Sequence, residues 1–470
     1  MTEFWDGPPE FTARRTGPDG TLPSALPVTD LAVASVAAAA SAATELLAAR
    51  GGPPAVATVD RSAVATAFTS ERHLRRDGEA FDSFAPLSGF FRTRDGWIRT
   101  HANYPHHAAR LLAVLGLPPG ADRAAVADRL AAVSSRSFEA DATKAGALAV
   151  SVRTPDEWAG SAPGRAAAAH PLVSVTAGSD AVRPLPGPVQ GPPEPGEAAR
   201  PAQAAGSAQA AGSPMPAAGL RVLDLTRVIA GPVATRTLAF LGAEVLRVDP
   251  PGLPELIPQH LDTGVGKRSA LLDLTDSAAR RRFAELLAGA DVLVTGYRPG
   301  ALAALGLDAG TIRANHPDLV VASLSAWGDT GPWRDRRGFD SLVQVATGIA
   351  IVEGGPGGPG GPGVLPAQAL DHATGYLLAA AILRALTRRA AGQSGSTIAV
   401  SLAGTASWLL DAPRPDDPGG ARPDPEPWLA ELPSAYGTIR HAVPPFRLDG
   451  GPRDWASGPV AWGTSEPRWL

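Results

Sequence analysis

Short apolar runs alternate with segments of helical spacing in the second half of the chain. Runs rich in Val, Leu and Ile predict strands at residues 220–226, 244–249, 291–297 and 319–328. Apolar positions three and four residues apart predict helices at residues 231–243, 277–290 and 308–317. Strands that alternate with helices run parallel and are joined by crossovers. The pattern therefore predicts an α/β fold with a doubly wound, mostly parallel, Rossmann-like sheet.

The first half of the chain mixes strands and helices differently. Residues 96–102 predict a strand, and residues 105–116 and 122–133 have the spacing of amphipathic helices. Residues 147–160 predict a strand and then a helix that Thr154 caps and Pro155 opens. This half therefore predicts a second, smaller α+β domain.

An Ala-rich run at residues 31–49 approaches the length of a membrane span. Ser and Thr dilute its hydrophobicity, and Glu45 interrupts it. We therefore expect a buried helix and no membrane partner.

Composition marks the boundaries between these regions. Residues 183–217 are rich in Pro, Ala and Gly and nearly free of large apolar side chains, which predicts a flexible linker. The linker separates a smaller-domain region at 1–182 from a Rossmann-like domain at 218–412, and a Pro-rich extension follows at 413–470. A Gly-Pro tract at residues 354–363 predicts a surface loop without a binding role.

Overall composition excludes several classes of function. The 470 residues are 44% hydrophobic with a net charge of −4 and no basic stripe, so a large core is possible and nucleic acid is not an expected partner. There is no Cys, which excludes disulfides, thiolate catalysis and Cys-ligated metals. The first twenty residues lack the features of a secretory signal, so we expect a cytoplasmic protein.

The strand and helix from residue 220 to residue 249 resemble the opening of a nicotinamide-binding domain. The spacing from Gly231 to Asp249 is suitable. However, the turn has one Gly followed by Pro232, where the dinucleotide fingerprint requires three glycines. We therefore expect a similar fold with a different ligand.

Five segments together resemble the family III CoA-transferases, which include formyl-CoA and carnitine CoA-transferases and α-methylacyl-CoA racemase. They are "GLRVLDLTRVIAGPVATRTLAFLGAEVLRVDPP", "GKRSALLDL", "ADVLVTGYRPGALAALGL", "HPDLVVASLSAWGDTGPWRDRRGFDSLVQVATGIA" and "LDHATGYLLAAAILRALTRR". They occur in family order. The first half resembles smaller-domain segments that usually follow the nucleotide-binding domain, so the chain looks permuted or like a partial copy fused to a more complete one.

The resemblance implies that Asp371 is the covalent nucleophile. In the family an aspartate attacks the acyl-CoA carbonyl, forms a mixed anhydride, and becomes an aspartyl-CoA thioester when CoA returns. This chemistry requires an exposed, ionised carboxylate beside a dry pocket, and the start of a helix favours the anion. Asp is equally a good helix cap, so capping is the alternative role. His372 is expected to be a partly exposed helix residue or to donate a hydrogen bond near the thioester.

One position separates CoA transfer from racemisation. The racemase branch uses a His directly after a Gly, and in this chain Phe339 follows Gly338. Phe cannot exchange a proton, which favours transfer of CoA between an acyl-CoA and a carboxylic acid. Asp340 is expected to fix a turn through backbone hydrogen bonds. A relative that binds CoA without turnover remains the alternative function.

CoA is expected as a substrate, with no tightly bound cofactor and no metal. Basic residues in loops after strands suit its phosphates. The residues that match the family's CoA contacts are Arg247, Lys267, Arg268, Tyr297, Arg298 and Pro299. A loop equivalent to the family's Gly-rich lid is not identifiable before the linker. The resemblance also implies a homodimer, although a fused two-copy chain could fold as a monomer that mimics one.

Overall fold

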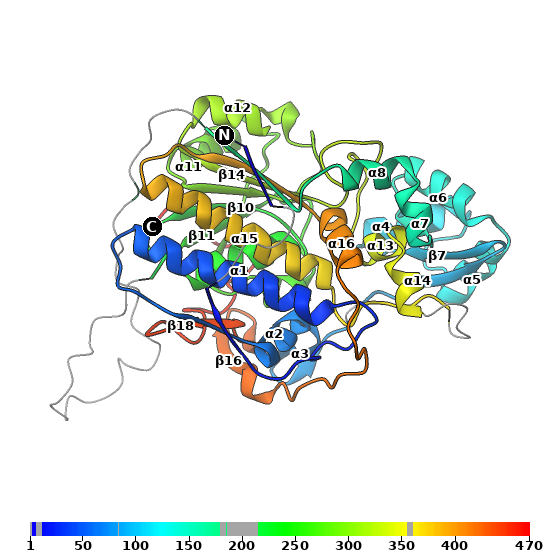
Figure 1. The fold of residues 1–470 in the computed structure, drawn as a ribbon. Coiled ribbons are helices and arrows are strands. Elements are labelled where there is room, and N and C mark those ends of the chain that lie inside the picture. The colour runs from blue at the N-terminus through cyan, green and yellow to red at the C-terminus, as the bar shows by residue number, and fades with distance from the viewer. Residues whose placement is uncertain (1, 6–11, 83, 179–184, 186–214, 355–360) are drawn as a thin grey trace.

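A central eight-stranded sheet organises the molecule (Figure 1). The computed structural model describes residues 2–5, 12–82, 84–178, 185, 215–354 and 361–470. Six neighbouring strands run parallel; at one side a strand of opposite direction pairs with them, and the last strand of the sheet pairs antiparallel to that one. In order across the sheet the strands are β1 (Thr2–Trp5), β9 (Val173–Ala177), β15 (Ser396–Ser401), β14 (Val320–Ser325), β13 (Val292–Thr295), β10 (Arg221–Leu225), β11 (Glu244–Asp249) and β12 (Lys267–Leu271). The chain reverses direction across the sheet between β10 and β13, so the prediction of a doubly wound fold is confirmed.

Both faces of this sheet are buried. Along β10, Val222 belongs to the larger hydrophobic core, whereas Leu223 belongs to a second core on the other face. Alternate side chains of a strand point to opposite faces, which explains why the strand sequences are almost continuously apolar. The helices and 3₁₀ turn of this domain are α9 (Ala230–Phe240), α10 (Ile257–Thr263), α11 (Ser277–Ala288), η2 (Ala303–Leu305), α12 (Ala309–Asn315), α13 (Asp340–Ala346), α14 (Ile349–Gly354), α15 (Ala369–Ala390) and α16 (Leu402–Asp411).

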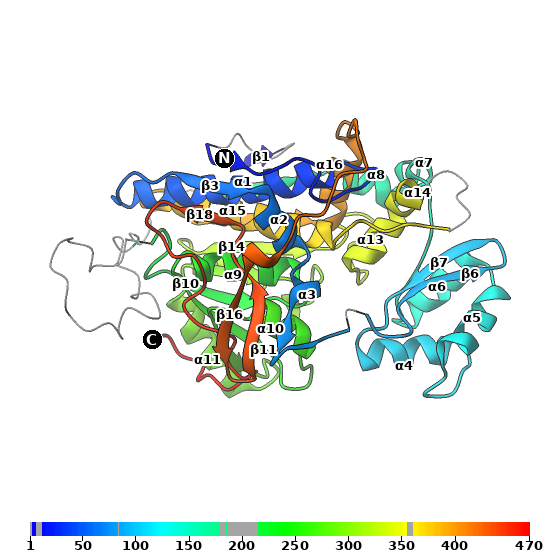
Figure 2. The same cartoon turned by 90° about the horizontal axis from the view of Figure 1, so that it is seen from below.

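The smaller domain stands apart from the central sheet in both views (Figures 1 and 2). It has its own core, with Phe91, Ile98, Leu111 and Leu130 buried at its centre. Its elements are β6 (Gly89–Thr93), β7 (Gly96–Thr100), α4 (Pro105–Val114), α5 (Arg123–Ala131), α6 (Ser135–Lys144) and β8 (Ala149–Ser151). The predicted α+β domain therefore exists, but it is confined to about residues 84–151.

The rest of the predicted region 1–182 belongs to the larger body, so the predicted boundary at residue 182 is wrong. Strands β1 and β9 extend the central sheet, and helices α7 (Pro155–Ala159) and α8 (Ala162–Ala168) precede β9. The N-terminal segment supplies β2 (Arg14–Thr16), α1 (Val28–Ala49), β3 (Ala57–Asp60), α2 (Arg61–Phe68), α3 (Ser70–His73), β4 (Arg75–Arg76) and β5 (Glu79–Ala80). Long-range strand pairing and burial of apolar side chains fix where these elements lie in the fold. A local shift in composition shows neither of these, so it does not locate the domain boundary.

The predicted linker falls mostly outside the described residues. At its end, Met215 and Ala217 are 7% and 1% exposed and pack in the larger body, so these positions do not belong to a flexible linker. Residues 355–360 of the Gly-Pro tract also lie outside the described part of the chain.

The Pro-rich segment 413–470 folds back onto the larger body. It forms η3 (Glu426–Trp428), β16 (Leu429–Ser434), β17 (Gly437–Ala442) and β18 (Phe446–Leu448). β17 pairs with β4, and β18 pairs with β3. Three indole N–H groups anchor the remainder: Trp455 donates to the Arg236 carbonyl, Trp462 to Asp249 and Trp469 to the Leu286 carbonyl. The segment is therefore an integral part of the fold and not an extension.

Helix α1 is long and apolar enough to cross a membrane by length and composition. In the fold, 78% of its most apolar window is buried, and α1 lies along α15 (Figure 2). The prediction of a buried helix is therefore confirmed.

Candidate active site

The first turn of α15 carries the predicted nucleophile, Asp371. Gln368 is the N-cap residue of this helix, and no side chain forms the usual capping hydrogen bond. Asp371 therefore does not act as the cap, which removes the main alternative role for its carboxylate.

A neighbouring carboxylate holds the start of α15 instead. Asp340, at the start of α13, is fully buried, and its Oδ2 accepts a hydrogen bond of 3.0 Å from the Asp371 backbone N–H. Its Oδ1 accepts from the Gln344 side-chain amide, whose Oε1 accepts from the Leu365 N–H at 3.0 Å. Asp340 thus makes the backbone hydrogen bonds expected of it, but it organises the start of α15, the helix that carries Asp371, and not a turn of its own.

The surroundings of Asp371 oppose its ionisation. Its side chain is 7% exposed, and burial, then Asp340, then Glu71 raise the pKa of Asp371 well above the usual range. Burial also raises the pKa of Asp340 to about 6 and that of Glu71 to about 7. The expectation of an exposed, readily ionised carboxylate is therefore wrong, because three acidic groups share one poorly solvated region.

Residues from the N-terminal segment cover this helix start. Phe68 of α2 stacks on His372 with ring centroids 5.1 Å apart. Arg72 of α3 donates to the Pro366 carbonyl at 2.6 Å, which ties α3 to the loop before α15. Glu71 lies between Phe68 and Arg72 in the sequence. Its Oε2 is enclosed and has no hydrogen-bond partner among the described residues. Because His372 is fully buried, the expectation of a partly exposed residue is wrong.

The smaller domain closes another side of the site. His101, directly after β7, stacks on Phe339 with centroids 3.7 Å apart and planes 5° apart. His107 meets the same ring edge-on, with centroids 5.9 Å apart. Burial lowers the pKa of the Arg99 guanidinium to about 10, and the charge of Asp340 offsets part of this shift. Phe339 therefore stands where the family's racemases have a His, but imidazoles from another domain surround it.

Burial and neighbouring charges keep these imidazoles neutral. Burial and then His107 lower the pKa of His101 to about 3, and burial and then His106 lower the pKa of His107 to about 3. The Nδ1 atoms of both rings are enclosed and have no hydrogen-bond partner among the described residues. The rings can thus exchange hydrogen bonds with a bound molecule without adding charge.

The predicted loop residues Tyr297, Arg298 and Pro299 lie together at a cavity of about 400 Å³. The loop follows β13, and Thr295, Ser323 and Ser325 at the carboxyl ends of β13 and β14 line the same space. Ligands of open α/β sheets bind at this edge. Arg298 also borders a cavity of about 100 Å³ against the smaller domain. Neither cavity includes Asp371.

The other predicted CoA contacts are engaged elsewhere. Lys267 is buried, and its Nζ donates to Asp224 at 3.0 Å and to Thr235 at 2.6 Å. Arg268 pairs with Glu244 at 3.0 Å and donates to carbonyls of the C-terminal segment.

Arg247 is also buried and bonded. Its guanidinium pairs with Asp249 at 2.8 Å and with Glu255 at 2.9 Å, and Glu255 accepts a hydrogen bond from Tyr104 of the smaller domain. Arg247, Lys267 and Arg268 therefore hold elements together and are not free to receive phosphates, which corrects the sequence-based expectation for all three.

Several residues of the site carry no local sequence signal. Phe68, Glu71, Arg99 and His101 approach Asp371 or its neighbours from segments roughly 270 to 300 positions earlier in the chain. No spacing rule connects them to α15, because tertiary packing alone brings them together.

The chain is similar to proteins of one family. The model of "CoA-transferase family III" matches residues 12–180 and 217–431. The chain is 36% identical over 187 residues to the probable fatty acyl-CoA transferase Rv3272 of Mycobacterium tuberculosis, a match that covers 37% of this chain and 47% of the relative. It is 34% identical over 187 residues to human succinyl-CoA:glutarate CoA-transferase, covering 37% and 42%.

The chain thus spans about half or less of the length of these curated relatives. Among solved structures, a crystal structure of Rv3272 from M. tuberculosis is 36% identical and covers 42% of this chain and 57% of its own, with a TM-score of 0.39.

Proposed function

Since the chain belongs to CoA-transferase family III, we propose that it moves CoA between an acyl-CoA and a carboxylic acid through a covalent intermediate on Asp371. The observation that carries the proposal is the Asp371 carboxyl group at the start of α15, which makes no capping bond although its backbone is held by Asp340. A carboxyl group that makes no capping bond among the described residues, in a region so costly for charge, is suited to chemistry.

CoA transfer takes place in two half-reactions on the Asp371 carboxyl group. An Asp371 oxygen attacks the thioester carbon, the C–S bond breaks, and CoA leaves as a thiolate with the electron pair. The thiolate then attacks the Asp371 carbonyl of the anhydride, which releases the first carboxylate and leaves an aspartyl-CoA thioester. The acceptor carboxylate repeats the two steps in reverse order. No proton is consumed once Asp371 is ionised, so neutral imidazoles nearby suffice.

Burial of Asp371 supports this chemistry in one respect. The attacking carboxylate loses its charge in the anhydride, and a site that disfavours the anion favours that loss. The same burial requires that the smaller domain and α3 move away from α15 to admit a thioester, while Tyr297, Arg298 and Pro299 receive the nucleotide end of CoA. We place the reaction in the cytoplasm because the chain has no cysteine to oxidise.

Trapping the intermediate tests the proposal. The protein is incubated with a panel of acyl-CoA esters and free acids, including fatty acyl-CoA and succinyl-CoA, and then with hydroxylamine. We expect mass spectrometry to find a hydroxamate at Asp371, and chromatography to find exchanged thioesters. Absence of an adduct with the whole panel would indicate a relative that binds CoA without turnover. Solvent deuterium at the α-carbon of a 2-methylacyl-CoA, without CoA exchange, would indicate racemisation.

Replacing Arg298 tests the assigned CoA cavity. Arg298 is exposed, borders both cavities, and donates a hydrogen bond of 3.0 Å to the Asp335 carbonyl. Because a guanidinium contact to phosphate strengthens ground-state and transition-state binding alike, Arg298→Ala should raise KM for acyl-CoA about fivefold and leave kcat nearly unchanged. Steady-state kinetics in acyl-CoA and in acceptor acid separate the two KM values.

Arg268→Ala is the matched control for that variant. Arg268 is committed to Glu244 and to the C-terminal segment, so its loss should leave both KM values unchanged. A KM for acyl-CoA that rises with Arg268→Ala and not with Arg298→Ala would reverse our assignment of the two arginines.

A further inference from the structure

The segment that carries Asp371 has a second copy earlier in the chain. Helix α1 (Val28–Ala49) and helix α15 (Ala369–Ala390) coincide when residue i is matched with residue i + 341. The same shift matches β3 with the last four residues of β15 and the first residue of α2, Arg61, with the first residue of α16, Leu402. A helix, a loop, a strand and the start of a helix thus correspond without a single insertion.

Local details of the two copies also correspond. Asp30 and Asp371 are each the third residue of their helix. The N-cap residues Pro27 and Gln368 have φ and ψ of −75° and 58° and of −75° and 61°. Gly51 and Gly392, just beyond the helix ends, have φ of 81° and 84°, a conformation that favours Gly. Agreement of caps and turns at one shift indicates a repeated unit and not two unrelated helices.

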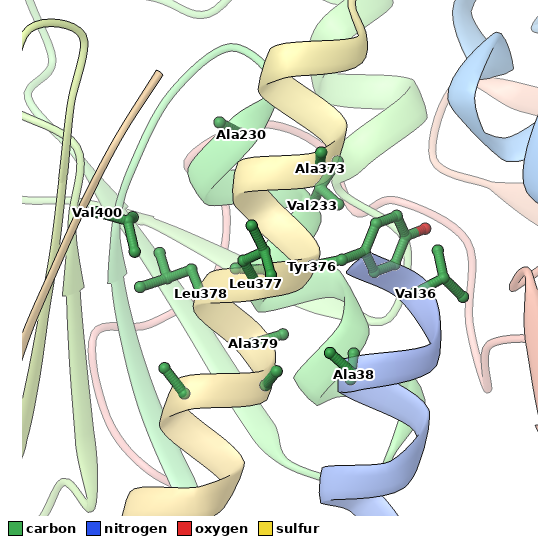
Figure 3. Close-up of a cluster of buried hydrophobic side chains, with 14 of the residues drawn as sticks. Val36, Ala38, Ala230, Val233, Ala373, Tyr376, Leu377, Leu378, Ala379 and Val400 are labelled. Atoms are coloured by element: carbon green, nitrogen blue, oxygen red, sulfur yellow. The ribbon is translucent and has the colours of Figure 1, made fainter. Parts of the chain in front are cut away.

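The two copies pack against each other. The run Ala38–Ala40 at the middle of α1 matches Ala379–Ala381 at the middle of α15, and these side chains are buried. Figure 3 shows α1 and α15 side by side, with Ala38 on the side of α1 that faces α15. Small residues at both centres allow the helices to approach closely. Matching surfaces that contact each other are the arrangement of a two-fold dimer, achieved here within one chain.

The two copies differ in the surroundings of their matching aspartates, Asp30 and Asp371. Asp30 is exposed, whereas Asp371 is 7% exposed. Helix α9 approaches α15 so closely that a Cβ on Gly375 would lie 2.5 Å from the Ala230 carbonyl oxygen, but the matching residue in α1, Ala34, carries a Cβ. The first copy thus lacks the cover that buries Asp371 in the second copy.

The first copy instead supplies walls to the second copy's site. Phe68 lies at the end of α2, and Glu71 and Arg72 follow in α3, where they contact or face the start of α15. The chain then continues into the smaller domain, which brings His101 against Phe339. The site around Asp371 is therefore composite, with one copy bearing the nucleophile and the other enclosing it.

We propose that residues 28–151 serve as a built-in second subunit: they enclose Asp371 of the same chain, Asp30 has lost its chemistry, and the active unit is a monomer with one reactive aspartate. The monomer rests on the repeat and its packing alone, whereas the single reactive aspartate also rests on the proposed function. This assembly replaces the homodimer that the family resemblance implied, since one chain already contains the contact that two chains would make.

Measurements of mass test the monomer without any need for activity. Sedimentation velocity of the full chain, at the enzyme concentration used for kinetics and at a hundredfold higher, should give one species near 48.0 kDa. The melting temperature should not change over the same range, because unfolding of a monomer does not depend on concentration. A dimer at the kinetic concentration, or a melting temperature that rises with concentration, would overturn the built-in subunit.

Counting adducts tests the single reactive aspartate. Intact mass after acyl-CoA and hydroxylamine should show one modification per chain, at Asp371, and Asp30→Asn should retain full activity and full labelling. Labelling at Asp30, or a loss of activity in Asp30→Asn with an unchanged melting temperature, would overturn the silent role of the first copy. An inactive protein that is nevertheless a monomer would contradict only the proposed function, and an active dimer only this inference.

Discussion

Asp371→Asn should reduce CoA transfer by at least about 10³-fold and abolish the hydroxylamine-trapped adduct. The amide has nearly the shape of the carboxylic acid, so packing at the start of α15 is kept. It cannot form an anhydride or an aspartyl thioester, and both half-reactions pass through that carboxyl group. The loss should therefore appear in kcat with every acyl-CoA of the panel.

The same variant should be more stable than the wild type at alkaline pH. The folded-state pKa of Asp371 lies above its unfolded value, so the stability contributed by the protonated group is complete below the unfolded pKa and is lost as pH rises through the folded pKa. Asn does not ionise and suffers no such loss. Melting temperatures of the two proteins should thus converge only below about pH 4, the unfolded value of Asp, and separate in favour of Asp371→Asn at alkaline pH.

Together these readouts exclude misfolding as the reason for inactivity. A variant that is inactive and less stable at every pH would mean that Asp371 is a structural residue, as would retention of more than a tenth of the activity. Asp30→Asn, at the matching place in the first copy, is the control for the substitution itself and should change neither quantity.

The elements of the central sheet were predictable because each depends on local chemistry. Asp276 accepts from the Ala279 N–H and begins α11 as its sequence predicted, and Thr154 forms a reciprocal pair of bonds with Glu157 at the start of α7. Apolar runs became strands because both faces of a parallel sheet are buried. The helix start at Asp371 also followed from the sequence, whereas the role of Asp371 as the nucleophile stays a prediction.

The surroundings of the nucleophile were not predictable in the same way. Arg247 and Lys267 look like ligand-binding cations in sequence. In the fold, however, they form ion pairs with carboxylates: Arg247 with Asp249 and Glu255, and Lys267 with Asp224. Burial of an unpaired cation is costly, so a buried Lys or Arg finds a carboxylate. Spacing along the chain does not show which predicted cation stays exposed at a cavity, as Arg298 does.

The repeat was the one readable signal of the composite site. Comparing the sequence with itself at a shift of 341 would have aligned Asp30 with Asp371, Ala38–Ala40 with Ala379–Ala381 and Gly51 with Gly392. Such a comparison would have placed α1 beside α15, and with it Phe68 and Glu71. Short-period searches miss a unit that recurs once, at a distance of most of the chain.

Asp340→Asn should reduce kcat about tenfold or more and destabilise the fold by about 1–3 kcal/mol, since one buried donor is left unsatisfied. The reason is the direction of a hydrogen-bond chain. Backbone N–H donors stand at both ends, at Asp371 and at Leu365, and Asp340 and Gln344 lie between them. One carboxylate and one amide satisfy both ends, but two amides place two donors against each other somewhere along the chain.

Exchanging the two side chains tests this reasoning directly. In Asp340→Asn combined with Gln344→Glu, the Asn oxygen again accepts from the Asp371 N–H, its amide donates to the new carboxylate, and that carboxylate accepts from the Leu365 N–H. We expect the double variant to recover most of the lost melting temperature and a large part of kcat. Gln344→Glu alone places two carboxylates in contact and should be destabilised. If the double variant were no better than Asp340→Asn, the chain of hydrogen bonds would not be what positions the nucleophile.

The pH profile of the double variant distinguishes two effects of Asp340 on Asp371: the hydrogen bond that positions its backbone, and the negative charge that raises its pKa. Asp340 is one of the charges that raise the pKa of Asp371, and the exchange moves that charge one side chain farther away. The pKa of Asp371 should fall, so the ionised, reactive fraction appears at lower pH and the acid limb of kcat moves in that direction. Recovery of kcat with an unmoved acid limb would mean that Asp340 acts on Asp371 through the backbone bond alone, because a charge that mattered could not be displaced without changing the titration.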